Sequence, residues 1–334
     1  MALLKLVPAE TNIPFSSWRF IAAGLSTLLV IGSIFAVATL GLNFGVDFRG
    51  GVTVEVADEE PIDIGAVRQA VSSLNLGDVK VQEIIDFAGS APAVVVFVEQ
   101  QDVGDPAPGT DADDGGEGVN NETAQQAAAS AVQTALRDLL GENVEFRKID
   151  VVGPTVSGEL IQRGITAVVL AIGMMLIYIW FRFEWQFSVG AIVALVHDVV
   201  LTLGMFAITR LDFNLSIIAA ILTIVGYSMN DTVVVYDRVR ENLRKYKKRP
   251  LNEVIDLSIN DTLSRTVMTS VTTLIALAAL YILGGEVLRG FTFAMIWGVV
   301  IGTYSSVFVA SPFLLATGVK RDWSQGTTPA TAAP

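Results

Sequence analysis

An amide and a carboxylate interrupt the apolar stretch Val225-Gly226-Tyr227-Ser228-Met229-Asn230-Asp231-Thr232-Val233-Val234-Val235-Tyr236-Asp237-Arg238. No charged residue occurs from Phe213 to Asn230, so a helix rising about 1.5 Å per residue would carry Asp231 into the hydrocarbon layer of a membrane. An ionised side chain costs several kcal/mol at that depth, and such residues usually face the protein interior and belong to an ion, proton or substrate pathway. The stretch therefore predicts a membrane-spanning helix that carries a functional carboxylate.

Composition extends this prediction to the whole chain. Of its 334 residues, 52% are hydrophobic and 17% are charged, and its mean hydropathy is +0.55, which is typical of polytopic membrane proteins. The net charge of -12 is concentrated in residues 43–158, which hold 21 acidic and 6 basic residues. No basic surface with interleaved aromatic residues is evident, so nucleic acid is not an expected partner. The lack of cysteine excludes disulfides, thiol catalysis and Cys-ligated metal.

Apolar segments predict six membrane spans. Their expected bounds are 20–42, 160–181, 186–208, 213–236, 266–284 and 290–316. Ala36-Val37-Ala38 mimics a signal-peptide cleavage site, but the apolar run continues to Phe44, so we expect an uncleaved first span. The lysines and arginines of the short loops fall on one side, which predicts cytoplasmic termini at residues 1–19 and 317–334 and a periplasmic segment at residues 43–158.

The segment after the first span has the pattern of a small soluble domain. Strands are expected at residues 52–56, 79–87, 93–99 and 144–151, and helices at residues 62–76 and 122–140. The order β-α-β-β-α-β is that of the ferredoxin-like arrangement. The predicted fold class is a polytopic α-helical membrane protein with six transmembrane helices and one periplasmic ferredoxin-like α+β domain. Residues 101–121 are acidic and predict a disordered loop, with loose calcium binding as the alternative.

Two further segments have more than one interpretation. Residues 237–265 form a basic cytoplasmic loop whose part from Leu251 to Leu263 alternates apolar and polar residues. This pattern predicts an interfacial helix on the membrane surface, or a docking site for a cytoplasmic partner. In the last span, Gly298 and Gly302 form a GxxxG motif followed one turn later by Ser306, which predicts close helix packing within the chain or against a partner.

Polar side chains on two neighbouring spans are expected to meet. Asp231 follows Thr223 and Tyr227 at spacings of four, so the three residues make one stripe on their helix. On the next span, Arg265 lies at the start of a face rich in threonine and serine at a similar depth. Arg265 is therefore the expected partner of Asp231, although it could also extend to the membrane surface.

The third span adds His197 and Asp198 near its middle. Because adjacent helical residues project about 100° apart, only one of the two is expected to join a shared pathway. Burial favours a neutral carboxyl and a nearby arginine favours the ionised form, so a movement that joins or separates Asp231 and Arg265 would release or capture a proton. Each elementary charge that crosses the membrane potential supplies about 2.3 kcal/mol per 100 mV. The alternative is that these groups only hold helices together through hydrogen bonds.

Three motifs resemble the SecF family of the bacterial protein-export machinery, within the resistance-nodulation-division superfamily. The first is Asn43-Phe44-Gly45-Val46-Asp47-Phe48-Arg49-Gly50-Gly51, and the second is Val152-Gly153-Pro154-Thr155-Val156. The third and most specific runs from Gly226 to Asn242. In the first motif, Gly45, Gly50 and Gly51 supply backbone freedom where a span meets a strand, and Asp47 is expected to order that turn.

The resemblance implies a subunit that pairs with SecD in a twelve-helix unit. That unit would use the proton gradient, with no other cofactor, to assist translocation of polypeptides across the bacterial inner membrane, together with the SecYEG translocon, YajC and YidC. The family's intramembrane aspartate corresponds to Asp231 and its basic partner to Arg265. The candidate proton-coupling residues are thus Asp231, Arg265, Asn230, Asp198 and His197, and the structural motif residues are Gly45, Asp47, Phe48, Gly50, Gly51 and Gly226.

Two other classes of membrane protein are considered. An exporter of small molecules or lipids from the same superfamily usually has larger, duplicated external domains, whereas only about 100 residues are present here. A purely structural membrane subunit would lack an ion pathway. The sequence contains no Walker loop, HExxH or GxSxG motif, so enzymatic hydrolysis is not expected.

Overall fold

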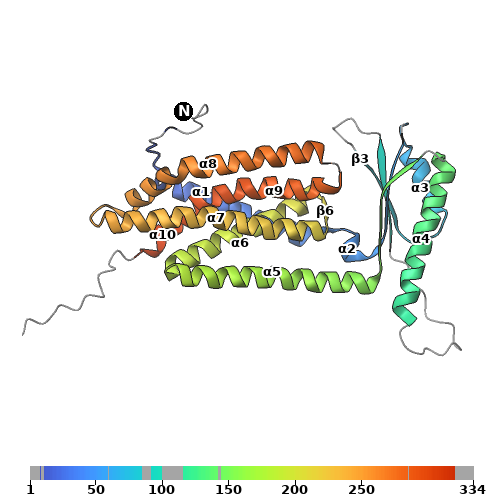
Figure 1. Cartoon of the computed structure of the whole chain (residues 1–334), viewed down its shortest axis with the longest axis horizontal. Coiled ribbons are helices and arrows are strands. Elements are labelled where there is room, and N and C mark those ends of the chain that lie inside the picture. The colour runs from blue at the N-terminus through green and yellow to red at the C-terminus, as the bar shows by residue number, and fades with distance from the viewer. Residues whose placement is uncertain are drawn as a thin grey trace, which may run out of the picture.

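The structure, a computed structural model, describes residues 8, 11–58, 60–84, 92–99, 116–141, 144–284 and 286–319. A long bundle of helices is joined at one end to a small domain of strands and helices (Figure 1). This arrangement confirms the predicted fold class.

Six helical segments of the described chain are long and apolar enough to span a membrane. They are α1 (Arg19–Leu40, after the 3-10 turn η1, Phe15–Trp18), α5 (Pro154–Arg182), α6 (Trp185–Thr209), α7 (Leu215–Lys245), α8 (Leu251–Leu283) and the last span, formed by α9 (Glu286–Ser305), the π-helical segment η2 (Ser306–Ala310) and α10 (Ser311–Thr317). At about 1.5 Å per residue, each span exceeds the roughly 30 Å hydrocarbon layer. Phe20 on α1 and Phe181 on α5 are 75% and 86% exposed, as expected of side chains that contact lipid.

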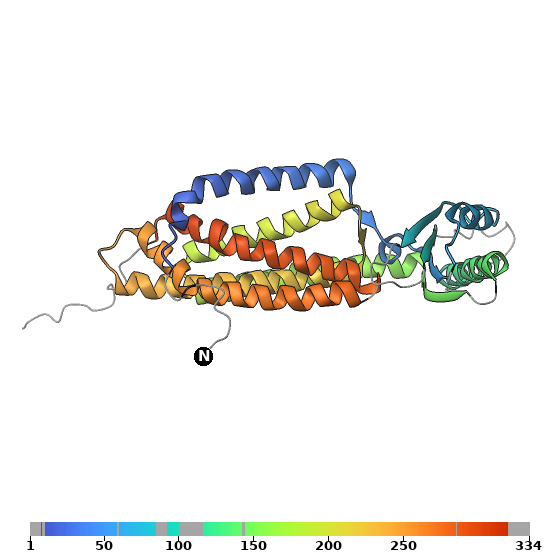
Figure 2. The same ribbon diagram turned by 90° about the horizontal axis from the view of Figure 1, so that it is seen from above.

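Helix α7 lies at the centre of the bundle and packs against α5, α6, α8 and α9. Helix α1 lies at the edge, alongside α6 (Figure 2). Aromatic side chains fill the core around Tyr236, whose hydroxyl donates a hydrogen bond to the carbonyl of Ala310 at 2.9 Å. Gly298 and Gly302 of α9 face α7, because a Cβ added to either would collide with Ile224 or Ser228. The GxxxG motif thus packs helices within the chain.

The domain has the β-α-β-β-α-β order of a ferredoxin-like fold. Its elements are β2 (Gly51–Ala57), α3 (Ile64–Ser72), β3 (Val79–Ile84), β4 (Ala93–Val98), α4 (Gly116–Leu140) and β5 (Glu145–Val152). The sheet order is β3-β4-β2-β5, with every neighbouring pair antiparallel. The buried valines of β2 pack with apolar residues of α3 and α4. Both helices cover the sheet face that is turned away from the bundle (Figure 1).

The structure corrects one predicted boundary and one predicted element. Helix α4 begins at Gly116, so residues 116–121 are helical and do not belong to the expected loop, while residues 101–115 and 85–87 lie outside the described part of the chain. The separate interfacial helix does not exist, because Leu251–Leu263 is the first part of the 33-residue helix α8.

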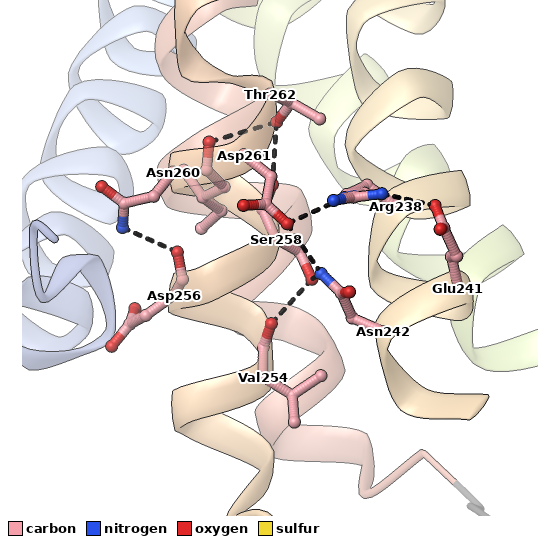
Figure 3. Close-up of polar contacts among 10 residues, drawn as sticks. Arg238, Glu241, Asn242, Val254, Asp256, Ser258, Asn260, Asp261 and Thr262 are labelled. Carbon is pink, nitrogen blue, oxygen red and sulfur yellow. Dashed lines mark hydrogen bonds and ion pairs between the residues drawn. The ribbon is translucent and has the colours of Figure 1, made fainter. Parts of the chain in front are cut away.

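Contacts within the chain explain why α8 starts early. Val254, Ile255 and Ile259 are buried against the bundle core. Figure 3 shows the polar contacts that join this part of α8 to the end of α7: Arg238 Nε donates to Asp261 Oδ2 at 2.8 Å, and Asn242 Nδ2 donates to Ser258 Oγ at 3.0 Å. On another face of α8, Asn260 bonds both the N–H and the carbonyl of Ile13 and Asp256 accepts from Ser16. The face predicted to contact lipid or a partner therefore packs against the chain's own elements.

Candidate functional site

Asp231 lies on α7 between α8 and the last span and is only 9% exposed. Its Oδ1 accepts a hydrogen bond from Thr266 Oγ1 at 2.6 Å, and its Oδ2 accepts one from Ser306 Oγ at 2.5 Å. Both donors are neutral hydroxyls. Three elements, α7, α8 and η2, are thus connected through one carboxylate.

A second buried carboxylate, that of Asp198 on α6, is only 1% exposed. Its Oδ1 lies 2.9 Å from His197 Nδ1, and its Oδ2 accepts from Ser228 Oγ at 2.5 Å and from Ser305 Oγ at 2.7 Å. Ser228 comes from α7, three residues before Asp231, and Ser305 ends α9. This carboxylate therefore connects α6 with α7 and with the end of α9.

The two carboxylates are linked through consecutive residues, because Ser305 bonds Asp198 and Ser306 bonds Asp231. The link lies where α9 passes into the π-helical segment η2, and Ser311 Oγ donates to the Ser306 carbonyl at 2.8 Å across this wider turn. Single π-helical turns within longer helices frequently occur at functional sites. Close packing of Gly302 against Ser228 brings α9 near enough for these contacts. We name Asp198, Asp231, Ser305 and Ser306 the carboxylate pair site.

The predicted ion pair between Asp231 and Arg265 is not formed. Arg265 is exposed, and Thr266, the next residue, contacts the carboxylate instead. Because neighbouring residues project about 100° apart on a helix, Thr266 and Arg265 cannot both face α7 in one orientation of α8. Asn230 is exposed as well, since its neighbour Asp231 takes the inward direction.

His197 and Asp198 were expected to project about 100° apart, with only one of them in a shared pathway, but both side chains lie in the same buried cluster. Their side chains turn toward each other and form a hydrogen bond, which brings both into the buried cluster. The other ring nitrogen, His197 Nε2, is buried and has no hydrogen-bond partner in the described structure. The His197 ring stacks near Tyr304, with centroids 6.1 Å apart, beside an apolar hollow of about 720 Å³ between α1, α6 and the last span.

Sequence reasoning missed Ser228 and Ser305, because serine in an apolar helix carries no distinctive signal. Ser306 has such a signal, since it continues the spacing of four that starts at Gly298 and Gly302. No group of three or more His, Cys, Asp or Glu side chains within the described residues is arranged to hold a metal ion.

The motif Asn43–Gly51 contacts the start of α7. Its strand β1 (Asn43–Phe44) pairs in parallel with β6 (Asp212–Phe213), and the short helix α2 (Val46–Arg49) follows. Asp47 Oδ2 accepts a hydrogen bond from the Leu215 N–H at 2.9 Å, and the N-cap residue Asn214 accepts one from the Ile217 N–H at 3.3 Å. Asp47 therefore adds a second capping side chain to α7, beyond the expected role in its own turn.

Different structural features explain why glycine occupies each of these positions in the motif. Gly50 and Gly51 have φ angles of 73° and 114°, which L residues with a side chain rarely adopt. Gly45 donates its N–H to Phe213 O at 2.9 Å, and a Cβ there would lie 3.3 Å from Asn214 Cβ. Phe48 packs among Phe44 and Phe213. No neighbour lies within 4 Å of a Cβ added to Gly226.

Known proteins share both the sequence and the fold. The family model for the C-terminal part of the protein export membrane proteins SecD and SecF matches residues 131–320, and the SecD/SecF GG motif model matches residues 35–57. The protein translocase subunit SecF of Rhodobacter capsulatus is 47% identical over 96% of this chain and 93% of its own length. That of Rickettsia bellii is 40% identical over 95% of this chain and 97% of its own length.

Longer relatives match over part of their length. The protein translocase subunit SecDF of Brucella abortus is 42% identical over 95% of this chain, which spans 39% of that relative. The crystal structure of SecDF from Thermus thermophilus, a translocon-associated membrane protein, superimposes with a TM-score of 0.77 at 30% identity, over 93% of this chain and 39% of the other.

Proposed function

Because this chain belongs to the SecF family of protein translocase subunits, we propose that it pairs with a SecD protein and that the pair uses the proton gradient to assist protein translocation. The SecDF relatives support the pairing, since 61% of their length lies outside the part that this chain matches. The observation that carries the proton step is the carboxylate pair site, in which two buried carboxylates connect four membrane spans (α6, α7, α8 and the last span) through neutral hydroxyls.

A change of protonation alters the hydrogen bonds of this site. Ser306 Oγ also lies 3.0 Å from the carbonyl of Thr303, so its single proton has two possible acceptors. When Asp231 is ionised, the hydroxyl donates to the carboxylate. When Asp231 takes up a proton, the carboxyl gains a donor of its own and Ser306 turns to Thr303. Ser305 has the same choice between Asp198 and the Gly302 carbonyl at 3.2 Å.

We name this change of acceptor by a serine hydroxyl the hydroxyl switch. It couples the protonation of Asp231 to helix packing. In the ionised state, Ser306 holds the last span against α7, and in the protonated state this contact is weaker. A rotation of α8 by about 100° would exchange Thr266 for Arg265 beside Asp231. Arg265 is thereby proposed to stabilise the ionised carboxylate in a second conformation.

The proposal includes a place and an orientation in the cell. We place the chain in the bacterial inner membrane with the domain in the periplasm and both termini in the cytoplasm. The basic cluster at Arg238–Arg249, at the end of the bundle opposite the domain, supports this orientation. The SecYEG translocon, YajC and YidC are the further partners proposed, and the chain itself carries out no hydrolysis.

Replacement of Asp231 tests the proton step. Inverted membrane vesicles that contain this chain and SecD are given a proton gradient, and translocation of a secretory protein is measured. We expect Asp231→Asn to lose the gradient-dependent part of translocation, at least tenfold, while Glu253→Gln, which removes an exposed carboxylate in the first turn of α8, retains it. Unchanged gradient-dependent translocation in Asp231→Asn would refute proton coupling at this site.

A further inference from the structure

A second polar cluster lies at the end of the bundle opposite the domain and takes no part in the proposed proton step. It surrounds an open hollow of about 670 Å³ between the end of α5 and one face of α7. Its lining consists of four basic and two acidic residues: Arg182, Asp237, Arg240, Glu241, Arg244 and Lys245. We name it the basic hollow.

The two carboxylates of the basic hollow already have arginine partners. Asp237 accepts hydrogen bonds from Arg182 Nη2 at 2.7 and 3.0 Å. Glu241 accepts one from Arg238 Nη1 at 2.6 Å, and Figure 3 shows this pair with Arg238 turned toward Asp261 of α8. Arg240 Nε is buried without a hydrogen-bond partner in the described structure. The hollow therefore keeps a net positive charge and an unused donor.

Aromatic residues place the basic hollow at a membrane surface. Trp180 and Trp185, at the corner between α5 and α6, are 60% and 54% exposed, and exposed tryptophans of membrane proteins gather at the headgroup level. The ion pair with Arg182 puts Asp237 at this depth. Arg240 and Lys245 follow three and eight residues later, about 4.5 and 12 Å further along the helix axis. Arg240 therefore lies within the polar layer of roughly 5–8 Å that covers the hydrocarbon on each side, and Lys245 lies just beyond it.

We infer that the basic hollow binds the phosphate headgroup of an anionic phospholipid. Arginine N–H groups form short, charge-assisted hydrogen bonds with phosphate oxygens, and basic pockets between membrane helices are suited to such headgroups. The acyl chains would lie along the adjoining apolar face of α5, where Met174, Ile177 and Phe181 are 65%, 59% and 86% exposed. Free phosphate offers the same oxygen atoms to the arginines but has no acyl chain to lie along this apolar face.

Native mass spectrometry of the full chain with SecD, stripped of lipid in detergent, tests the inference. Phosphatidylglycerol, phosphatidylcholine and inorganic phosphate are added separately. We expect phosphatidylglycerol to bind at least ten times more tightly than either of the others, and Arg240→Gln to weaken its binding about tenfold. Lys248→Gln, which removes an exposed charge on the neighbouring loop, should leave the binding unchanged.

Several results would overturn the inference. Equal binding of phosphatidylcholine would show that no headgroup is selected, and equal binding of inorganic phosphate would show an ion site only. An equal loss in Lys248→Gln would show that general charge, and not the basic hollow, attracts the lipid. If Arg240→Gln fails to fold, Lys245→Gln replaces it with the same expected loss, while Arg240→Lys should recover part of the binding.

Discussion

At the level of single residues, the carboxylate pair site depends on which hydroxyls reach the two aspartates. Their hydroxyl donors are Thr266, Ser306, Ser228 and Ser305, and none of these donors carries a charge. A neutral donor can change its acceptor at little cost, whereas an arginine would hold the carboxylate ionised. This property makes the serines suitable for the proton step that we propose.

Replacement of Ser306 removes the hydroxyl that changes its acceptor and leaves the Asp231 carboxylate in place. A hydrogen bond to a charged group contributes about 1.5–3 kcal/mol, so we expect Ser306→Ala to reduce gradient-dependent translocation by about tenfold or more. The measurement uses the vesicle assay described for Asp231. Thr292→Ala is the control, because Thr292 is a buried hydroxyl that bonds only its own helix at the Leu288 carbonyl. An equal loss in both variants would mean that buried hydroxyls serve packing alone.

At the level of helices and strands, two contacts position the helices that carry the site. The first is the close approach of α9 to α7 at Gly298 and Gly302, which lets the serines at the end of α9 reach both carboxylates. The second is the cap that Asp47 places on the start of α7. Since β2 begins directly after α2, this cap joins the sheet of the domain to the helix that carries Asp231.

The glycine contact can be tested by adding a single methyl group. A Cβ at Gly302 would lie 2.9 Å from Ser228 Cβ, and overpacking of this kind costs about 1–3 kcal/mol. We expect Gly302→Ala to lower the melting temperature of the purified SecD complex. Gly226→Ala, on α7, has no neighbour within 4 Å and should preserve or raise it, because alanine favours helix by up to about 1 kcal/mol. A lower melting temperature for Gly226→Ala than for Gly302→Ala would contradict the packing of α9 against α7.

The cap on α7 predicts a local effect on hydrogen exchange. Loss of a capping side chain costs about 1 kcal/mol, so we expect Asp47→Ala to speed amide exchange at the first turn of α7, near Leu215, by roughly fivefold. Asp63→Ala is the matched control, because Asp63 caps α3 by accepting from Gly65 N and Ala66 N. This control should change exchange within the domain only. Protection at Leu215 that is unchanged in Asp47→Ala would exclude the connection.

At the level of the whole molecule, the domain, the helix bundle and the basic hollow at the far end of the bundle lie in this order along one axis. The sheet of the domain turns its uncovered face toward the bundle (Figure 1). Four basic residues line the basic hollow at the other end. Such a molecule has two chemically different ends, which is what an oriented membrane protein requires.

The orientation is testable because the chain has no cysteine. Ser73→Cys places a thiol on the domain, and Lys248→Cys places one beyond the basic hollow, both at exposed positions. In spheroplasts, a membrane-impermeant maleimide should label the first variant and not the second, while inverted vesicles should give the reverse pattern. Labelling of Lys248→Cys from outside would reverse the proposed orientation.

The sequence determined the class of fold, because length, hydropathy and β-strand alternation are local properties of a chain. It also identified Asp231, since an ionisable residue in an apolar span is conspicuous without any knowledge of its neighbours. Tertiary structure decided the partners: Thr266 in place of Arg265, both His197 and Asp198 in place of one, and a serine pair on the last span. The reason is that helix rotation and side-chain rotamers choose between adjacent residues, and those choices depend on packing between segments far apart in the chain.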